Sequence, residues 1–94
     1  MPDIQRETTA DGGRYSLTQN GATAELTWRT ASPTRIVADH TGVPDALRGT
    51  GAGLALLERM VADARAEGTQ IVPQCPFVEA MRRRHPDWAD AFTT

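Results

Sequence analysis

Apolar and polar positions alternate along the first forty residues, which is the pattern of β-strands with one buried face. The clearest alternation covers residues 22–29, where every second side chain is apolar. Strands are expected over residues 4–8, 14–18, 22–29 and 34–40. The turn signals between them are Asp11-Gly12-Gly13, Asn20-Gly21 and Ala31-Ser32-Pro33. In the first of these turns, glycine is expected to supply a positive φ angle. The pattern predicts an antiparallel meander.

The apolar period lengthens to three and four residues over residues 52–67, which predicts an amphipathic helix packed on the sheet. Its apolar stripe is formed by Leu54, Leu56, Leu57, Met60, Val61 and Ala64. Gly68 suits the end of this helix. Residues 69–75 then predict a fifth strand, parallel to the fourth because a helical crossover joins the two.

A second helix is expected over residues 77–85, with Pro76 in its first turn and Pro86 ending it. The expected fold class is therefore α+β, a mixed sheet with the element order β-β-β-β-α-β-α. The length of 94 residues is typical of one domain, expected to span residues 1–94.

Composition excludes several classes of function. All ten basic residues are arginine, so no lysine-centred mechanism is available. The net charge of −2 argues against a general nucleic-acid binder. The single cysteine, Cys75, forms no intrachain disulfide and no cysteine-rich zinc site, and no metal site is expected. Signal-peptide character and the roughly 20 apolar residues of a membrane helix are both missing, so we expect a cytoplasmic protein without a membrane partner.

The glycine-rich run Leu47–Gly53 opens the long helix directly after a strand and a turn. Glycines let backbone N–H groups approach a ligand, and the helix dipole then favours an anion such as phosphate. Arg48 adds a positive charge with bidentate reach. The dinucleotide fingerprint fails because its third glycine would fall at Leu54, and a phosphate-binding P-loop fails because it needs lysine. The alternative is a glycine-rich helix start without a ligand.

The pattern Arg-x-x-Gly-x-Gly at Arg48, Gly51 and Gly53, placed after four strands and before a helix and a parallel strand, resembles the GNAT N-acetyltransferase superfamily. The chain is further similar to a group of very small, single-domain GNAT-like proteins. That similarity covers most of the chain, and its most specific pieces are the Cys-Pro-Phe and Arg-Arg-His-Pro sequences. The matching runs are residues 43–51, 72–78 and 83–87.

The resemblance implies acetyl-CoA as cofactor, with its pyrophosphate on the glycine-rich turn. The fourth and fifth strands would splay apart around the pantetheine arm, to which Val43 would offer backbone groups. Arg83 and Arg84 would contact the 3′-phosphate or the adenosine end; their alternative is a solvated helix end that complements the dipole. The expected cofactor-binding residues are Val43, Arg48, Gly49, Thr50, Gly51, Ala52, Gly53, Arg83 and Arg84.

His40 and Cys75 are the candidate catalytic residues. They end the fourth and fifth strands, and parallel neighbours place both at the carboxyl edge of the sheet, where the long helix also begins. This topology is expected to bring the two side chains and the anion site together. A thiol there can act as nucleophile or proton donor, and a histidine can act as base. The alternatives are a cysteine packed under the second helix and a histidine that only makes hydrogen bonds at a strand end.

The resemblance implies an N-acetyltransferase that acts on an amine, either a small molecule or a protein. Cys75 would serve as acid or as acetyl acceptor. Many larger members use a tyrosine late in the chain as general acid, whereas the only tyrosine here is Tyr15, on an early strand. One alternative is a CoA-binding or regulatory module without transfer activity. Another is a protein-interaction domain whose glycine turn is purely structural.

Overall fold

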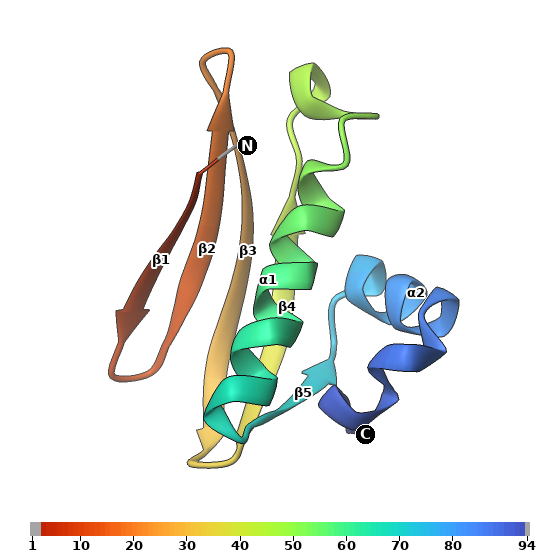
Figure 1. Ribbon diagram of the computed structural model, residues 1–94. Coiled ribbons are helices and arrows are strands. Elements are labelled where there is room, and N and C mark those ends of the chain that lie inside the picture. The colour runs from red at the N-terminus through yellow and green to blue at the C-terminus, as the bar shows by residue number, and fades with distance from the viewer. Residues whose placement is uncertain (1–2, 94) are drawn as a thin grey trace.

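The computed structural model describes residues 3–93 and contains a five-stranded sheet in the order β1-β2-β3-β4-β5. The long helix α1 crosses one face of this sheet, and the short helix α2 lies beyond the β5 edge, beside α1 (Figure 1). The elements are β1 (Ile4–Thr9), β2 (Gly12–Gln19), β3 (Ala22–Ser32), β4 (Arg35–Gly42), η1 (Asp45–Leu47), α1 (Ala52–Glu67), β5 (Gln70–Pro73), α2 (Pro76–Arg84) and η2 (Pro86–Ala91), where η marks a 3-10 helix. Within residues 3–93, no helix is long and apolar enough to cross a membrane.

The predicted fold class and element order are confirmed. Strands β1 to β4 pair antiparallel, and β5 pairs parallel to β4 over Arg35–Ala38. β4 continues to Gly42, whereas β5 ends at Pro73, so the two strands separate after their fourth pair. The last backbone hydrogen bond between the two segments runs from the Cys75 amide, just after β5, to the Ala38 carbonyl, at 2.9 Å. The expected splay of the fourth and fifth strands is therefore present.

The core lies between α1 and the sheet face that α1 covers. The alternation of β3 places Ala24, Leu26 and Trp28 in this core, while the polar positions between them face away from α1. The helix contributes the buried stripe Leu56, Leu57, Met60, Val61 and Ala64, whereas Leu54 is only half-buried. At the end of α1, Gly68 adopts a φ of 71°, and its amide donates to the Ala64 carbonyl, as expected for a glycine cap.

The first hairpin differs from the prediction in its glycines. The turn consists of residues 10–11, and Gly12 and Gly13 already belong to β2 without a positive φ. Glycine is needed at these two positions because Trp28 leaves no room for a side chain. A Cβ at Gly12 would lie 2.1 Å from the Trp28 carbonyl oxygen, and one at Gly13 would lie 2.4 Å from the Trp28 ring. The expectation of a positive φ was wrong because the close approach of Trp28, not the turn, selects glycine here.

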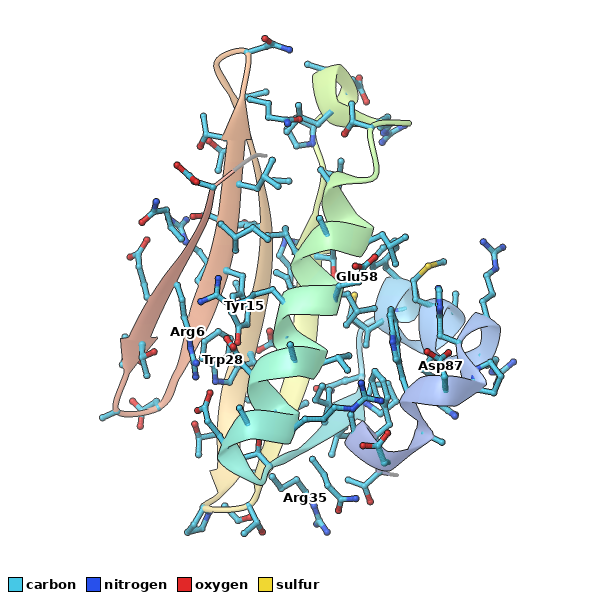
Figure 2. The ribbon with its side chains drawn as sticks, viewed as in Figure 1. Arg6, Tyr15, Trp28, Arg35, Glu58 and Asp87 are labelled. Atoms are coloured by element: carbon cyan, nitrogen blue, oxygen red, sulfur yellow. The ribbon has the colours of Figure 1, made fainter. Side chains whose placement is uncertain are left out.

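A polar cluster joins the edge strand β1 to the second half of α1. Arg6 donates hydrogen bonds to Asp63 at 3.1 Å and to Glu67 at 2.6 Å. Its guanidinium lies 5.4 Å from the centre of the Trp28 ring, and Figure 2 shows Arg6, Tyr15 and Trp28 gathered between β1 and α1. Because β1 pairs with a strand on only one side, this cluster is its main link to the helix layer.

Candidate functional site

The glycine-rich turn bends twice before α1 begins. Gly49 and Gly51 have φ angles of 79° and 82°, in the left-handed region that favours glycine. Between them, the Thr50 amide and hydroxyl both donate to the Leu47 carbonyl, at 3.2 and 2.5 Å. The two glycines and this double hydrogen bond fix the path by which the chain enters the helix.

The start of α1 presents free backbone N–H groups. The first helical hydrogen bond runs from the Ala55 amide to the Gly51 carbonyl, at 2.9 Å. The amides of Ala52, Gly53 and Leu54 have no acceptor among residues 3–93, and no side chain caps the helix. Three unpaired donors and the positive end of a 16-residue helix favour an anion at this position.

A groove of about 310 Å³ lies beside this helix start, between the turn and α2. The groove is lined mainly by apolar and backbone groups of Val43, Leu47, Arg48, Gly49, Gly51, Ala52, Gly53, Leu54, Phe77 and Met81. A Cβ at Gly53 would lie 3.0 Å from Cζ of Phe77 and 3.3 Å from Cγ2 of Val43. The structure thus brings most of the expected cofactor residues to one groove. Thr50 belongs to the same turn but does not line it.

Arg48 stands at the mouth of this groove. Its side chain is 75% exposed and pairs with Asp45, at 3.2 Å, across one turn of chain. Ion pairs between such exposed groups contribute about 0–1 kcal/mol. The guanidinium can therefore leave Asp45 for a more highly charged partner at low cost.

The two arginines expected near the adenosine end lie on different sides of α2. Phe77 and Met81 are four residues apart on the side that faces the groove, and Arg84 continues that side. Arg83 donates instead to Glu79, at 3.0 Å, and lines a separate cavity of about 540 Å³. Arg84 is thus on the same side of α2 as Phe77 and Met81 but does not line the groove, and Arg83 lines the separate cavity.

Phe77 and Met81 are groove residues that sequence reasoning did not single out. Their spacing of four residues, just after the Cys-Pro sequence that begins α2, is enough to predict that Phe77 and Met81 lie on one side of this helix. The side of α2 that faces α1 is set by how the two helices pack, however. The local sequence around Phe77 and Met81 does not predict that packing.

Cys75 lies where β4 and β5 separate. It is the residue before the first turn of α2 and is only 5% exposed. Its Sγ lies 3.3 Å from Oγ1 of Thr41. Thr41 pairs with the buried Leu26 of β3 and so faces the helix side of the sheet. The thiol is therefore held on that side, beside the end of β4 that has no β5 partner.

His40 lies on the opposite face of the sheet. It pairs with Thr27 of β3, its side chain is 61% exposed, and its Nε2 lies 3.8 Å from Oε1 of Glu25. Because side chains alternate along a strand, His40 and its neighbour Thr41 point to opposite faces. The structure places His40 and Cys75 at the same edge, as expected, but does not bring their side chains together.

Tyr15 lies in the core and not in the groove. The residue is 2% exposed, and its hydroxyl donates to Asp63 of α1 at 2.7 Å. Burial first, and the hydrogen bond to Asp63 second, raise the pKa of Tyr15 above its usual value of 10. This environment stabilises the neutral phenol and keeps it away from any ligand in the groove.

Comparisons with known proteins agree with this geometry. A family model of the GCN5-related N-acetyltransferases matches residues 14–91. The NMR solution structure of a GCN5-like N-acetyltransferase candidate from Staphylococcus aureus is similar, with 29% identity over 99% of this chain and 91% of that chain and a TM-score of 0.74. A search of curated proteins gave no match. Since the family model spans most of the sequence and the fold agrees, the chain belongs to the GCN5-related N-acetyltransferase (GNAT) family of enzymes.

Proposed function

We propose that this protein transfers an acetyl group from acetyl-CoA to an amine. The observation that carries the proposal is the groove of about 310 Å³ in which Val43, the glycine-rich turn and α2 meet. This groove combines an anion-favouring helix start with a mainly apolar wall. A ligand with a pyrophosphate and a long, less polar arm has the matching chemistry.

The residues of the turn fit the pyrophosphate. A Cβ at Gly49 or Gly51 would meet no atom within 4 Å, so the backbone there is open to a ligand. The free amides of Ala52 and Gly53 would donate to its oxygens, and Arg48 would add a charge-assisted hydrogen bond. Arg84, on the groove side of α2, would contact the 3′-phosphate; Arg83 would need to leave Glu79 to do the same.

The separated ends of β4 and β5 support a site for the pantetheine arm. Beyond Ala38, β4 runs on to Gly42 without β5 beside it, and Val43 follows at the groove. Backbone groups of this segment would hydrogen-bond the amides of the arm, as a neighbouring strand would do. The arm would end close to Cys75.

Two residues would serve the chemistry. Bound acetyl-CoA supplies an acetyl group activated as a thioester. Cys75 would either give its proton to the departing CoA thiolate, or accept the acetyl group on Sγ while CoA leaves as the thiol with the proton that Sγ loses. His40, on the open face beside Glu25, would take the proton of an amine that approaches from that face. The position of His40 favours a role toward the amine over a role toward Cys75.

The alternative is a CoA-binding module without transfer activity. Two observations favour it: Cys75 is only 5% exposed, and Tyr15 lies in the core, where it cannot act as general acid in the groove. Under this alternative the same groove binds the cofactor, but Cys75 only packs beneath α2.

Calorimetric titration with CoA and with acetyl-CoA tests the common part of both proposals. Binding is expected for the unchanged protein and not for Gly51→Glu, which adds a negative charge at the anion site and strains a φ of 82°. Thermal unfolding of the free variant shows whether it still folds. No binding at millimolar ligand would exclude both functions.

Mass spectrometry after incubation with acetyl-CoA then separates the two. An acetyl group on Cys75, or turnover on a panel of amines that is lost in Cys75→Ala, establishes transfer. A protein that binds acetyl-CoA but shows neither is a binding module.

A further inference from the structure

We propose that Thr41 is a positioning residue for Cys75, whose hydroxyl donates a hydrogen bond to the sulfur in its thiolate form. This inference rests on the proposed chemical role of Cys75. The side chain that hydrogen-bonds the sulfur is then Thr41, and not His40, the titratable residue that precedes it in the chain.

The backbone holds both partners in place. Thr41 lies opposite Leu26 in the antiparallel pairing of β3 and β4, and the Cys75 amide is bonded to the Ala38 carbonyl at 2.9 Å. The distance of 3.3 Å between Oγ1 and Sγ is within hydrogen-bond range for sulfur. A hydroxyl can donate or accept, whereas a thiolate can only accept. Ionisation of Cys75 therefore makes Thr41 the donor.

Thr41 is the side chain that contacts the sulfur of Cys75 among the described residues. Within residues 3–93, no other side chain lies within hydrogen-bond distance of Sγ. His40 points to the opposite face, toward Glu25. Among the described residues, Thr41 therefore supplies the side-chain hydrogen bond to the sulfur.

Because Cys75 is the only cysteine, alkylation by iodoacetamide reports on this thiol alone. The thiolate sulfur displaces iodide, and the thiol proton passes to the buffer. Thr41→Val keeps the shape of the side chain and removes the hydroxyl. We expect it to lower the alkylation rate at pH 7 about tenfold and to move the rate profile to higher pH, because a hydrogen bond to a charged group is lost. Thr41→Ser restores the hydroxyl and should recover most of the rate.

Two variants serve as controls. His40→Ala changes a residue on the opposite face, and Thr30→Val makes the same chemical change on an exposed strand position. Both should alkylate within about twofold of the unchanged protein. Local opening would speed alkylation of a buried thiol, so a lower rate in Thr41→Val cannot come from damage to the fold.

The proposal is overturned if Thr41→Val reacts at least as fast as the unchanged protein, if Thr41→Ser fails to recover the rate, or if His40→Ala slows it as much. None of these measurements needs acetyl-CoA. A failure here is therefore separate from a failure of the ligand titrations, which test the proposed function itself.

Discussion

At the scale of single residues, glycine is required for two different physical reasons. Gly49, Gly51 and Gly21 adopt positive φ angles in open surroundings, so a side chain there would strain the backbone without a clash. Gly12 and Gly13 have ordinary backbone angles, but Trp28 occupies the space where a Cβ would lie. The first kind tolerates a small side chain at a modest cost, and the second kind does not.

Gly13→Ala should therefore destabilise the protein more than Gly21→Ala. The new Cβ would lie 2.4 Å from the Trp28 ring and 2.5 Å from the Glu7 carbonyl oxygen. Overpacking costs roughly 1–3 kcal/mol or more, and two contacts this short belong at the upper end, whereas a left-handed alanine costs roughly 1–2 kcal/mol. Chemical denaturation of the two variants measures both losses. Equal losses would mean that Trp28 moves aside freely and that space is not the constraint.

At the scale of elements, the link between β1 and α1 depends on pH. The hydrogen bond from Arg6 is the largest cause that lowers the pKa of Glu67 below its ordinary value of 4.5. A carboxyl whose pKa is lower in the folded state contributes stability above its unfolded pKa. This contribution is lost as the pH falls through the folded pKa. The link is therefore complete at neutral pH and weakens in acid.

Arg6→Met tests this link. At pH 7 the loss should be about 1 kcal/mol, since the ion pairs are partly exposed and the contact with Trp28 is removed with them. At pH 3 the loss should be smaller, because protonation of Glu67 weakens the interaction in the unchanged protein too. Arg35→Met changes an exposed arginine without an ion pair among residues 3–93 and should have little effect at either pH. An equal loss for Arg6→Met at both pH values would contradict the assignment to Glu67.

The same scale shows what the sequence can predict. The alternation of β3 and the period of α1 depend on which residues are local neighbours, so both elements and their buried sides were predicted correctly. The side chains of His40 and Cys75 lie on opposite faces of the sheet. This arrangement depends on the pairing of β3 with β4, which contains an irregularity between Thr27 and Trp28. Phe77 lines the groove only because α2 packs beside Gly53. Such relations between distant segments leave no periodic signal.

At the scale of the whole molecule, the two ends of α1 contact different parts of the protein. Its first turn borders the groove, while Asp63 and Glu67 in its second half hold β1 through Arg6. Among residues 3–93, no side-chain hydrogen bond or ion pair joins the two regions. Changes at one end should therefore leave the property of the other end intact.

CoA at one hundred times its dissociation constant should stabilise the protein by about 2.7 kcal/mol, because the ligand binds only the folded state. For a domain of this size, that corresponds to a rise in Tm of roughly 10–20 °C. Gly53→Val should abolish the rise, since its side chain would extend into the groove from a Cβ already 3.0 Å from Phe77. Arg6→Met should start from a lower Tm and keep the full rise. A reduced rise in Arg6→Met would show that the two ends of α1 are coupled, and a full rise in Gly53→Val would place the ligand outside the groove.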